Sequence, residues 1–212
     1  MTASLLIASA LIVVALILAG TSLAADRLQM PPDEKRRFTG RAQTMLFAWI
    51  AFVVAIGATG ILSKFPPAVG PVTLLSAILF ARSPIGRLLE TLPFHFLIGF
   101  QAFRILAEAY LFLRWKDGAI PVELTFEGMN FDIVTGIFAL VLAFVLAKKP
   151  WRPLIWAWSL GGTALLITIV ALHMKLARES VVHFPYVLLP GVLVWSAVVG
   201  HLIVYQKLLA KD

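Results

Sequence analysis

Long apolar runs, separated by short polar or proline-containing segments, dominate this chain. Each run is bounded by charged residues, prolines or both, and a membrane-crossing helix needs about 20 such residues. Seven runs approach that length: residues 3–24, 43–63, 66–81, 92–113, 131–147, 153–174 and 186–206. The pattern therefore predicts an all-α fold, a polytopic transmembrane helix bundle with seven spans, forming one domain over residues 1–212.

The third run is the shortest and leaves an alternative open. It holds about 16 residues and begins with Pro66 and Pro67. At a rise of about 1.5 Å per residue, a helix of that length barely crosses a core of about 30 Å. The alternative is six spans with a re-entrant third segment.

The basic residues distinguish these two topologies, because cytoplasmic loops are enriched in lysine and arginine. With seven spans and the N-terminus outside, the inner loops carry twelve basic residues and the outer loops five. If the third run does not cross, the split becomes nine against eight. The sequence thus favours seven spans, with the N-terminus out and the C-terminus in. The twelve are Arg27, Lys35, Arg36, Arg37, Arg41, Arg82, Arg87, Lys148, Lys149, Arg152, Lys207 and Lys211.

Composition agrees with a membrane protein and excludes several kinds of chemistry. Apolar residues make up 60% of the chain and charged residues 14%, against about 25% charged in soluble domains. The net charge of +7 lies in short loops, so it does not indicate a nucleic-acid partner. The absence of cysteine excludes disulfides, thiolate metal sites and thiol catalysis. No nucleotide-binding or HExxH pattern is present.

The segments around the first loop carry two further expectations. Ser22-Leu23-Ala24 has the small residues of a signal-peptide cleavage site. Nothing basic precedes the first run, however, and its length favours an uncleaved helix. Residues 26–41 are predicted to form the longest charged loop, solvated on the cytoplasmic side near anionic lipid.

The fourth run is unusually polar for a segment that crosses a bilayer. Gln101, Arg104 and Glu108 are spaced by three and four residues, which puts them on one face of a helix. A charge in hydrocarbon costs about 2.5 kcal/mol or more, so an intramembrane arginine and glutamate form a functional-site hypothesis.

Residues 125–132 form a second polar stretch, at the outer mouth of the fifth run. One interpretation is that Asn130 caps the helix and Asp132 interacts favourably with the helix dipole. The other is that Asp132 meets Arg104, because buried charges need partners. We predict that Arg104 is buried and bonded to Glu108 or Asp132, with Gln101 and Asn130 completing its donors and acceptors. Such a cluster is either a structural clamp or a site for a solute or proton.

The histidines are predicted to bind no cofactor. His95 and His201 differ in depth and face, which argues against a bis-histidine haem. A local polar pair is expected for His201 and Tyr205, which are four residues apart. His173, near the outer end of the sixth run, can join the polar mouth.

Several motifs resemble one family. The elements Gln101-x-x-Arg104-x-x-x-Glu108, Thr125-Phe-Glu-Gly-x-Asn-Phe-Asp-Ile133, Phe184-Pro-Tyr-x-x-Leu-Pro190 and His201-Leu202 resemble a family of small bacterial integral membrane proteins with no assigned activity. The resemblance covers roughly the second half of the chain. It implies a location in the bacterial inner membrane and points to the same polar residues.

Three functions remain open at this point. The first is a transporter or ligand-binding protein whose outward-facing pocket takes a small anionic or zwitterionic solute, or a proton. The second is an intramembrane enzyme or cofactor protein that uses His173, His201 and the carboxylates. The plan of the alkaline ceramidase and adiponectin receptor superfamily is similar in span count, but Ala197 and Tyr205 stand where its zinc spacing needs a second histidine. The third is a structural subunit of a membrane complex. The predicted ligand-binding residues are Gln101, Arg104, Glu108, Glu127, Asn130, Asp132 and His173.

Overall fold

The computed structural model describes residues 2–210, apart from the side chain of Arg178, and is 84% helical. No strand occurs within the described range. The helices are α1 (Thr2–Arg27), α2 (Pro32–Thr59), α3 (Val69–Arg82), α4 (Pro84–Glu90), α5 (Phe94–Phe100), α6 (Arg104–Lys116), α7 (Asp132–Lys148), α8 (Arg152–Leu176) and α9 (Trp195–Leu209). The prediction of an all-α bundle is confirmed.

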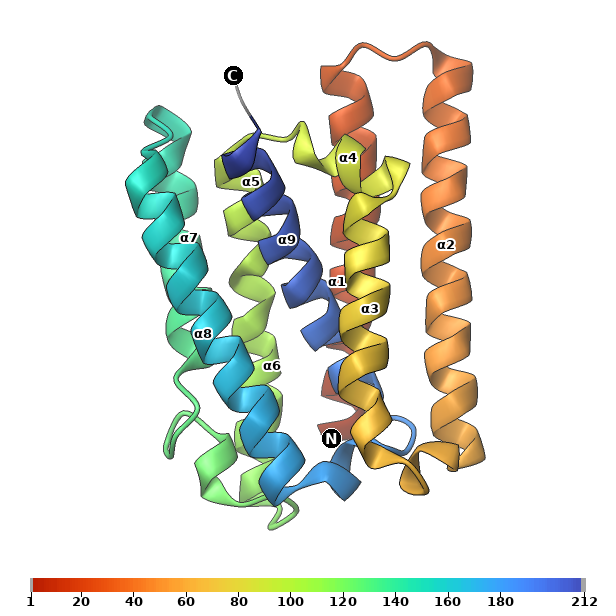
Figure 1. Ribbon diagram of the computed structural model, residues 1–212, viewed down its shortest axis with the longest axis vertical. Helices are drawn as coiled ribbons and strands as arrows, with labels where there is room; N and C mark the ends of the chain where they lie inside the picture. Colours follow the sequence, from red (N-terminus) through yellow and green to blue (C-terminus); the bar gives the residue numbers. More distant parts are fainter. Residues whose placement is uncertain (1, 211–212) are drawn as a thin grey trace.

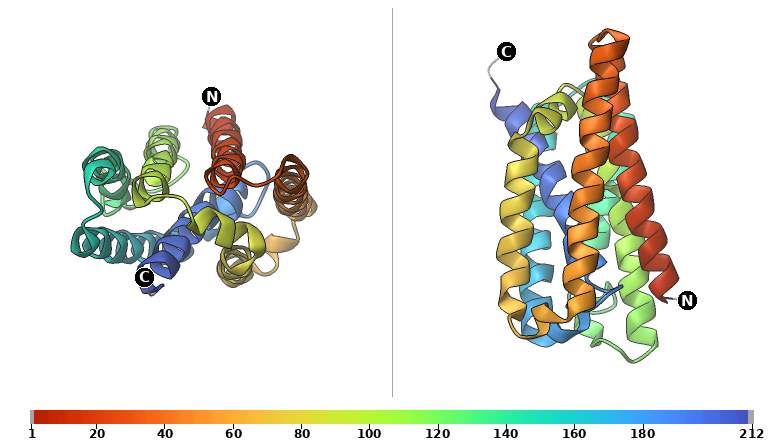
Figure 2. Two further views of the ribbon diagram at one scale, coloured as in Figure 1. Left: turned by 90° about the horizontal axis from the view of Figure 1, so that it is seen from above. Right: turned by 90° about the vertical axis from the view of Figure 1, so that its right-hand side faces the viewer.

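The long helices run alternately up and down and form one bundle (Figure 1). The connection between α1 and α2, helix α4 and the C-terminal end of α9 lie at one end. The N-terminal end of α1 and the connections after α2, α6 and α8 lie at the other. Helix α9 lies among the others when the bundle is seen from above (Figure 2) and packs against α3, α4, α5 and α8. Accordingly, 61% of the 18-residue apolar stretch within Leu189–Leu209 is buried inside the protein. The corresponding share for Pro32–Thr59 is 22%.

Five helical segments are long and apolar enough to cross a membrane: α1, α2, Phe94–Lys116, α8 and Leu189–Leu209. A sixth is present if α3 and α4, which meet at an angle of 69°, form one bent span. Helix α7 is apolar but has 17 residues, which correspond to about 25 Å. The chain is therefore a helical membrane protein with five to six candidate spans.

The prediction of a charged loop over residues 26–41 is wrong, because α2 already begins at Pro32. Proline is favoured at the first helical position, and Asp33 and Glu34 in the first turn interact favourably with the helix dipole. The lysine and arginine residues that follow are good helix formers. An ion pair of 2.6 Å between Lys35 Nζ and Asp26 Oδ1 joins the start of α2 to the end of α1.

The third run is helical but ends in a sharp turn. Helix α3 stops at Arg82, and the hydroxyl of Ser83 accepts a hydrogen bond of 3.2 Å from the backbone N–H of Gly86. Ser83 thus caps α4, a role for which serine is strongly preferred. The cap directs the chain away from the axis of α3 and accounts for the bend.

Two of the helical runs are interrupted by a turn that is not α-helical. A 3₁₀ turn at Gln101–Phe103 interrupts the run between α5 and α6, directly before Arg104. A π-helical turn at Leu189–Val194 precedes α9 and contains Pro190, which lacks a backbone donor. Irregular turns within helices are frequent at functional positions.

Candidate functional site

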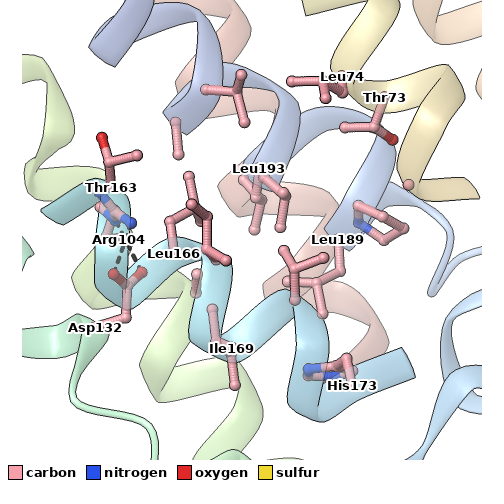
Figure 3. Close-up of a pocket in the computed structure, with 18 of the residues that line it drawn as sticks. Thr73, Leu74, Arg104, Asp132, Thr163, Leu166, Ile169, His173, Leu189 and Leu193 are labelled. Carbon is pink, nitrogen blue, oxygen red and sulfur yellow. Dashed lines mark hydrogen bonds and ion pairs between the residues drawn. The ribbon is translucent and has the colours of Figure 1, made fainter. Parts of the chain in front are cut away.

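Arg104 is the centre of the buried polar cluster and is 1% exposed. Its Nε donates to Asp132 Oδ2 over 2.8 Å, and its Nη2 lies 2.6 Å from Asp132 Oδ1. Figure 3 shows the two side chains facing each other across this pair of contacts. The pairing is bidentate, which is the strong geometry for arginine and carboxylate. The prediction that Arg104 is buried and bonded to Glu108 or Asp132 is confirmed, with Asp132 as the partner.

The sequence brings this pair together at the start of two helices. Arg104 is the first residue of α6 and Asp132 the first residue of α7. Asn130 Oδ1 accepts a hydrogen bond of 3.0 Å from the backbone N–H of Asp132, two residues later, and so forms a turn just before the helix. The interpretation that Asp132 meets Arg104 is confirmed. The interpretation that Asn130 caps the helix is wrong, because Phe131 holds the N-cap position without a side-chain capping bond and Asn130 precedes it.

The other edge of the guanidinium contacts α9 and α8. Arg104 Nη1 lies 2.8 Å from His201 Nε2, and Nη2 lies 3.4 Å from the carbonyl oxygen of Gly162. A guanidinium only donates, so His201 Nε2 is the acceptor and the ring proton sits on Nδ1. His201 Nδ1 then donates to the hydroxyl of Ser159 over 3.0 Å. Arg104 thus connects α6 with α7, α8 and α9.

The expected polar pair of His201 and Tyr205 is wrong. The hydroxyl of Tyr205 donates to the carbonyl oxygen of Ser159 over 2.9 Å and lies 2.8 Å from Thr163 Oγ1. The two rings share a face of α9, as their spacing requires, but each bonds to a neighbouring helix. His201 and Ser159 are cluster members that the sequence-based site left out, although the depth of His201 in an apolar run was a usable signal.

Gln101 contacts α9 rather than Arg104. Its Nε2 donates to the carbonyl oxygen of Ala197 over 3.1 Å, and the side chain is fully buried. This contact depends on Gly200, since a Cβ at that position would collide with Gln101 Nε2. The prediction that Gln101 completes the bonds of Arg104 is therefore wrong; the amide instead fixes the distance between α9 and the turn before α6.

Glu108 lies one turn beyond Arg104 and is 2% exposed. Its two carboxylate oxygens lie 2.7 and 2.8 Å from Asn130 Nδ2, which also donates to the carbonyl oxygen of Leu124. None of the described lysine, arginine or histidine side chains lies within ion-pair distance of Glu108. The cluster therefore contains one carboxylate more than it has cations.

The remaining predicted site residues lie apart from this network. Glu127 is exposed, and its backbone N–H donates to Thr125 Oγ1, so its side chain does not join the cluster. The reason is the tight turn at Thr125, which directs Asn130 inward and Glu127 outward. His173 is 8% exposed, and its Nε2 has no hydrogen-bond partner among the described residues.

A cavity of about 530 Å³ joins His173 to the cluster. Helices α3, α6, α8 and α9 supply most of its walls, which are mainly leucine, isoleucine and valine. Arg104, Asp132 and Thr163 lie at one end and His173 at the other, with leucine and isoleucine side chains between them (Figure 3). The polar side chains along the cavity are Thr73, Arg104, Glu108, Asp132, Thr163, His173, His201 and Tyr205.

Comparisons with protein-family models, with curated proteins and with solved structures give no match for this chain. Within residues 2–210, no group of three or more histidine, aspartate or glutamate side chains is placed to hold a metal ion. Any proposal about function therefore rests on the geometry of the cluster and the cavity.

Proposed function

We propose that the chain is a seven-span protein of the bacterial cytoplasmic membrane, with its N-terminus out and its C-terminus in. Two observations support this topology. The helices alternate in direction, and the connections at the α4 end of the bundle carry most of the basic residues, as expected for the cytoplasmic side. Helix α7 then counts as the fifth span and α3 as the third.

We further propose that the cavity binds a small ligand and couples its binding or transport to a proton. The observation that carries this proposal is Glu108, a buried carboxylate that lines the cavity without a basic partner. Asp132 already neutralises Arg104. An uncompensated buried charge costs about 3–5 kcal/mol, so Glu108 gains a proton or a cationic group that arrives through the cavity.

This charge balance favours some ligands over others. A simple anion has to compete with Asp132 for a guanidinium whose edges are already bonded. A zwitterion or a cation instead brings the positive charge that Glu108 lacks. The pocket predicted for anionic or zwitterionic solutes is thus better suited to the zwitterionic class, or to a proton.

The cluster is less suited to a hydrolase. Ser159 and His201 lie 3.0 Å apart, as a nucleophile and its base would. However, Arg104 donates to His201 Nε2, which places the ring proton on Nδ1, facing Ser159. The imidazole therefore donates to the serine and is not available to accept its proton. Binding or transport is the better interpretation of these contacts.

Infrared spectroscopy and proton flux test this proposal. The protein in liposomes should show a carboxylic-acid carbonyl band that Glu108→Gln removes. Glu127→Gln makes the same change on an exposed carboxylate and should leave the band unchanged. With a pH-sensitive dye trapped inside the liposomes, a panel of small amines and amino acids should include one that drives a proton flux dependent on Glu108. If the band is absent from the parent protein and no tested compound drives a flux, the proposal is wrong.

A further inference from the structure

Exposed lining residues on α3 and α8 indicate that the cavity opens sideways between these helices. Both helices line it, and both pack against α9, which forms the back wall. Two apolar lining residues at the opening are largely exposed, Leu74 at 50% and Ile167 at 64%. In a membrane protein such exposed apolar side chains face lipid. A molecule dissolved in the bilayer can therefore enter the cavity sideways, without passing through water.

The buried charged and imidazole groups that this cavity offers to a ligand are mainly acceptors. Glu108 has two carboxylate oxygens bonded only to an amide. The Nε2 atom of His173, also in the cavity lining, is buried without a hydrogen-bond partner among the described residues. The main donor, Arg104, is already bonded to Asp132 and His201. The cavity therefore needs a ligand that donates hydrogen bonds.

We propose that the ligand is a single-chain amphiphile with a protonated amine head. Its ammonium group donates to Glu108 at the cluster end of the cavity, and its alkyl chain lies on the leucine and isoleucine band and leaves between α3 and α8. An ammonium carries three donors and the positive charge that the cluster lacks. This inference rests on the proposed function, because it assigns a ligand class to the same cavity.

The first test compares head groups on one chain length. Radiolabelled dodecylamine, dodecanol and dodecanoate are bound to the protein in phosphatidylcholine nanodiscs, with empty nanodiscs subtracted. Dodecylamine should bind at least about tenfold more tightly than dodecanoate, the ratio expected for one hydrogen bond to a charged group. This comparison uses the parent protein and needs no variant to fold. Equal binding of the amine and the carboxylate, or tighter binding of dodecanol, overturns the proposal.

The second test uses matched variants. Glu108→Gln keeps an oxygen for Asn130 and should weaken dodecylamine binding at least about tenfold. His173→Phe changes the opposite end of the cavity and should weaken it less, and Glu127→Gln should have no effect. Ile167→Trp narrows the opening and should slow dodecylamine association, whereas Leu140→Trp, at another exposed apolar position on α7 that does not line the cavity, should not.

Butylamine separates this inference from the proposed function. If butylamine binding depends on Glu108 while dodecylamine binding does not, the amphiphile is excluded and the proposed function stands. If dodecylamine binds equally fast to the Ile167→Trp and Leu140→Trp proteins, side entry is excluded. If neither amine depends on Glu108, the amine ligand is excluded, and the proposed function is then decided by the carboxylic-acid band and the flux assay.

Discussion

At the scale of single residues, Arg104 is the side chain on which the buried cluster depends. Its guanidinium contacts Asp132, His201 and the backbone of Gly162, so its removal leaves Asp132 as an unpaired buried charge. We expect Arg104→Ala to lower the free energy of unfolding by about 3–5 kcal/mol. Arg104→Lys should lower the free energy of unfolding by less, because lysine keeps the positive charge. It should not match arginine, because lysine lacks the planar fork that contacts both carboxylate oxygens.

Denaturant unfolding in detergent micelles measures both changes. Arg36→Ala is the matched control, since Arg36 is exposed on the first turns of α2. A loss for Arg104→Ala no larger than that for Arg36→Ala would show that the bidentate pair contributes little to stability.

The contribution of the hydrogen bond between Arg104 and His201 to stability can be tested separately. His201→Phe keeps a ring of similar shape but leaves Arg104 Nη1 without its acceptor, and we expect a loss of about 1–3 kcal/mol. His201→Gln restores an acceptor oxygen and should recover part of this loss. His183→Phe, an exposed histidine bonded to Ser63, controls for the substitution. Thermal unfolding followed by circular dichroism gives the ranking, and equal melting temperatures for His201→Phe and His183→Phe would contradict it.

Much of this residue-scale picture follows from the sequence, and the rest depends on contacts between helices. Spacing puts Gln101, Arg104 and Glu108 on one face, and the expense of a buried charge predicts a carboxylate partner. Spacing along one helix cannot choose between Glu108 and Asp132, since the choice depends on where α7 begins. It also cannot show that His201 turns toward Arg104, or that the turn at Thr125 leaves Glu127 outside.

At the scale of helices, two adjacent glycines of α8 should respond differently to the same substitution. A Cβ on Gly162 would lie 2.7 Å from Thr135 Cγ2 and 2.9 Å from His201 Cε1, whereas a Cβ on Gly161 meets nothing within 4 Å. Forcing atoms into a packed core costs about 1–3 kcal/mol. We expect that loss for Gly162→Ala, measured by denaturant unfolding. Gly161→Ala should be neutral or slightly stabilising, because alanine is the better helix former. Equal effects of the two substitutions would contradict the close approach of α8 and α9.

The boundaries of the helices show which sequence signals are reliable at this scale. The apolar runs locate the helices because burial in lipid demands internal hydrogen bonds throughout. They do not locate the helix ends, since charged residues such as those of 32–41 continue α2 beyond the apolar core. The turns inside helices, at Gln101–Phe103 and Leu189–Val194, have no clear hydrophobicity signal because the apolar pattern continues through them.

At the scale of the whole molecule, the distribution of charge predicts the orientation in the membrane. The end of the bundle that holds α4 and the connection between α1 and α2 carries most of the lysine and arginine residues. The opposite end carries the connection between α6 and α7. If the basic end is cytoplasmic, the cavity end at His173 faces the outer leaflet, which is the side from which a ligand would reach Glu108.

Cysteine labelling in intact cells tests this orientation directly, because the chain has no cysteine of its own. Arg36 and Asp117 are both exposed and lie at opposite ends of the bundle, on α2 and just after α6. A membrane-impermeant maleimide should label Asp117→Cys in whole cells, and should label Arg36→Cys only after the membrane is opened. Since an odd number of crossings separates the two positions in the seven-span topology, labelling of both from the same side would exclude it. Labelling of Arg36→Cys alone from outside would keep the span count and invert the protein, and the cavity would then open toward the cytoplasmic leaflet.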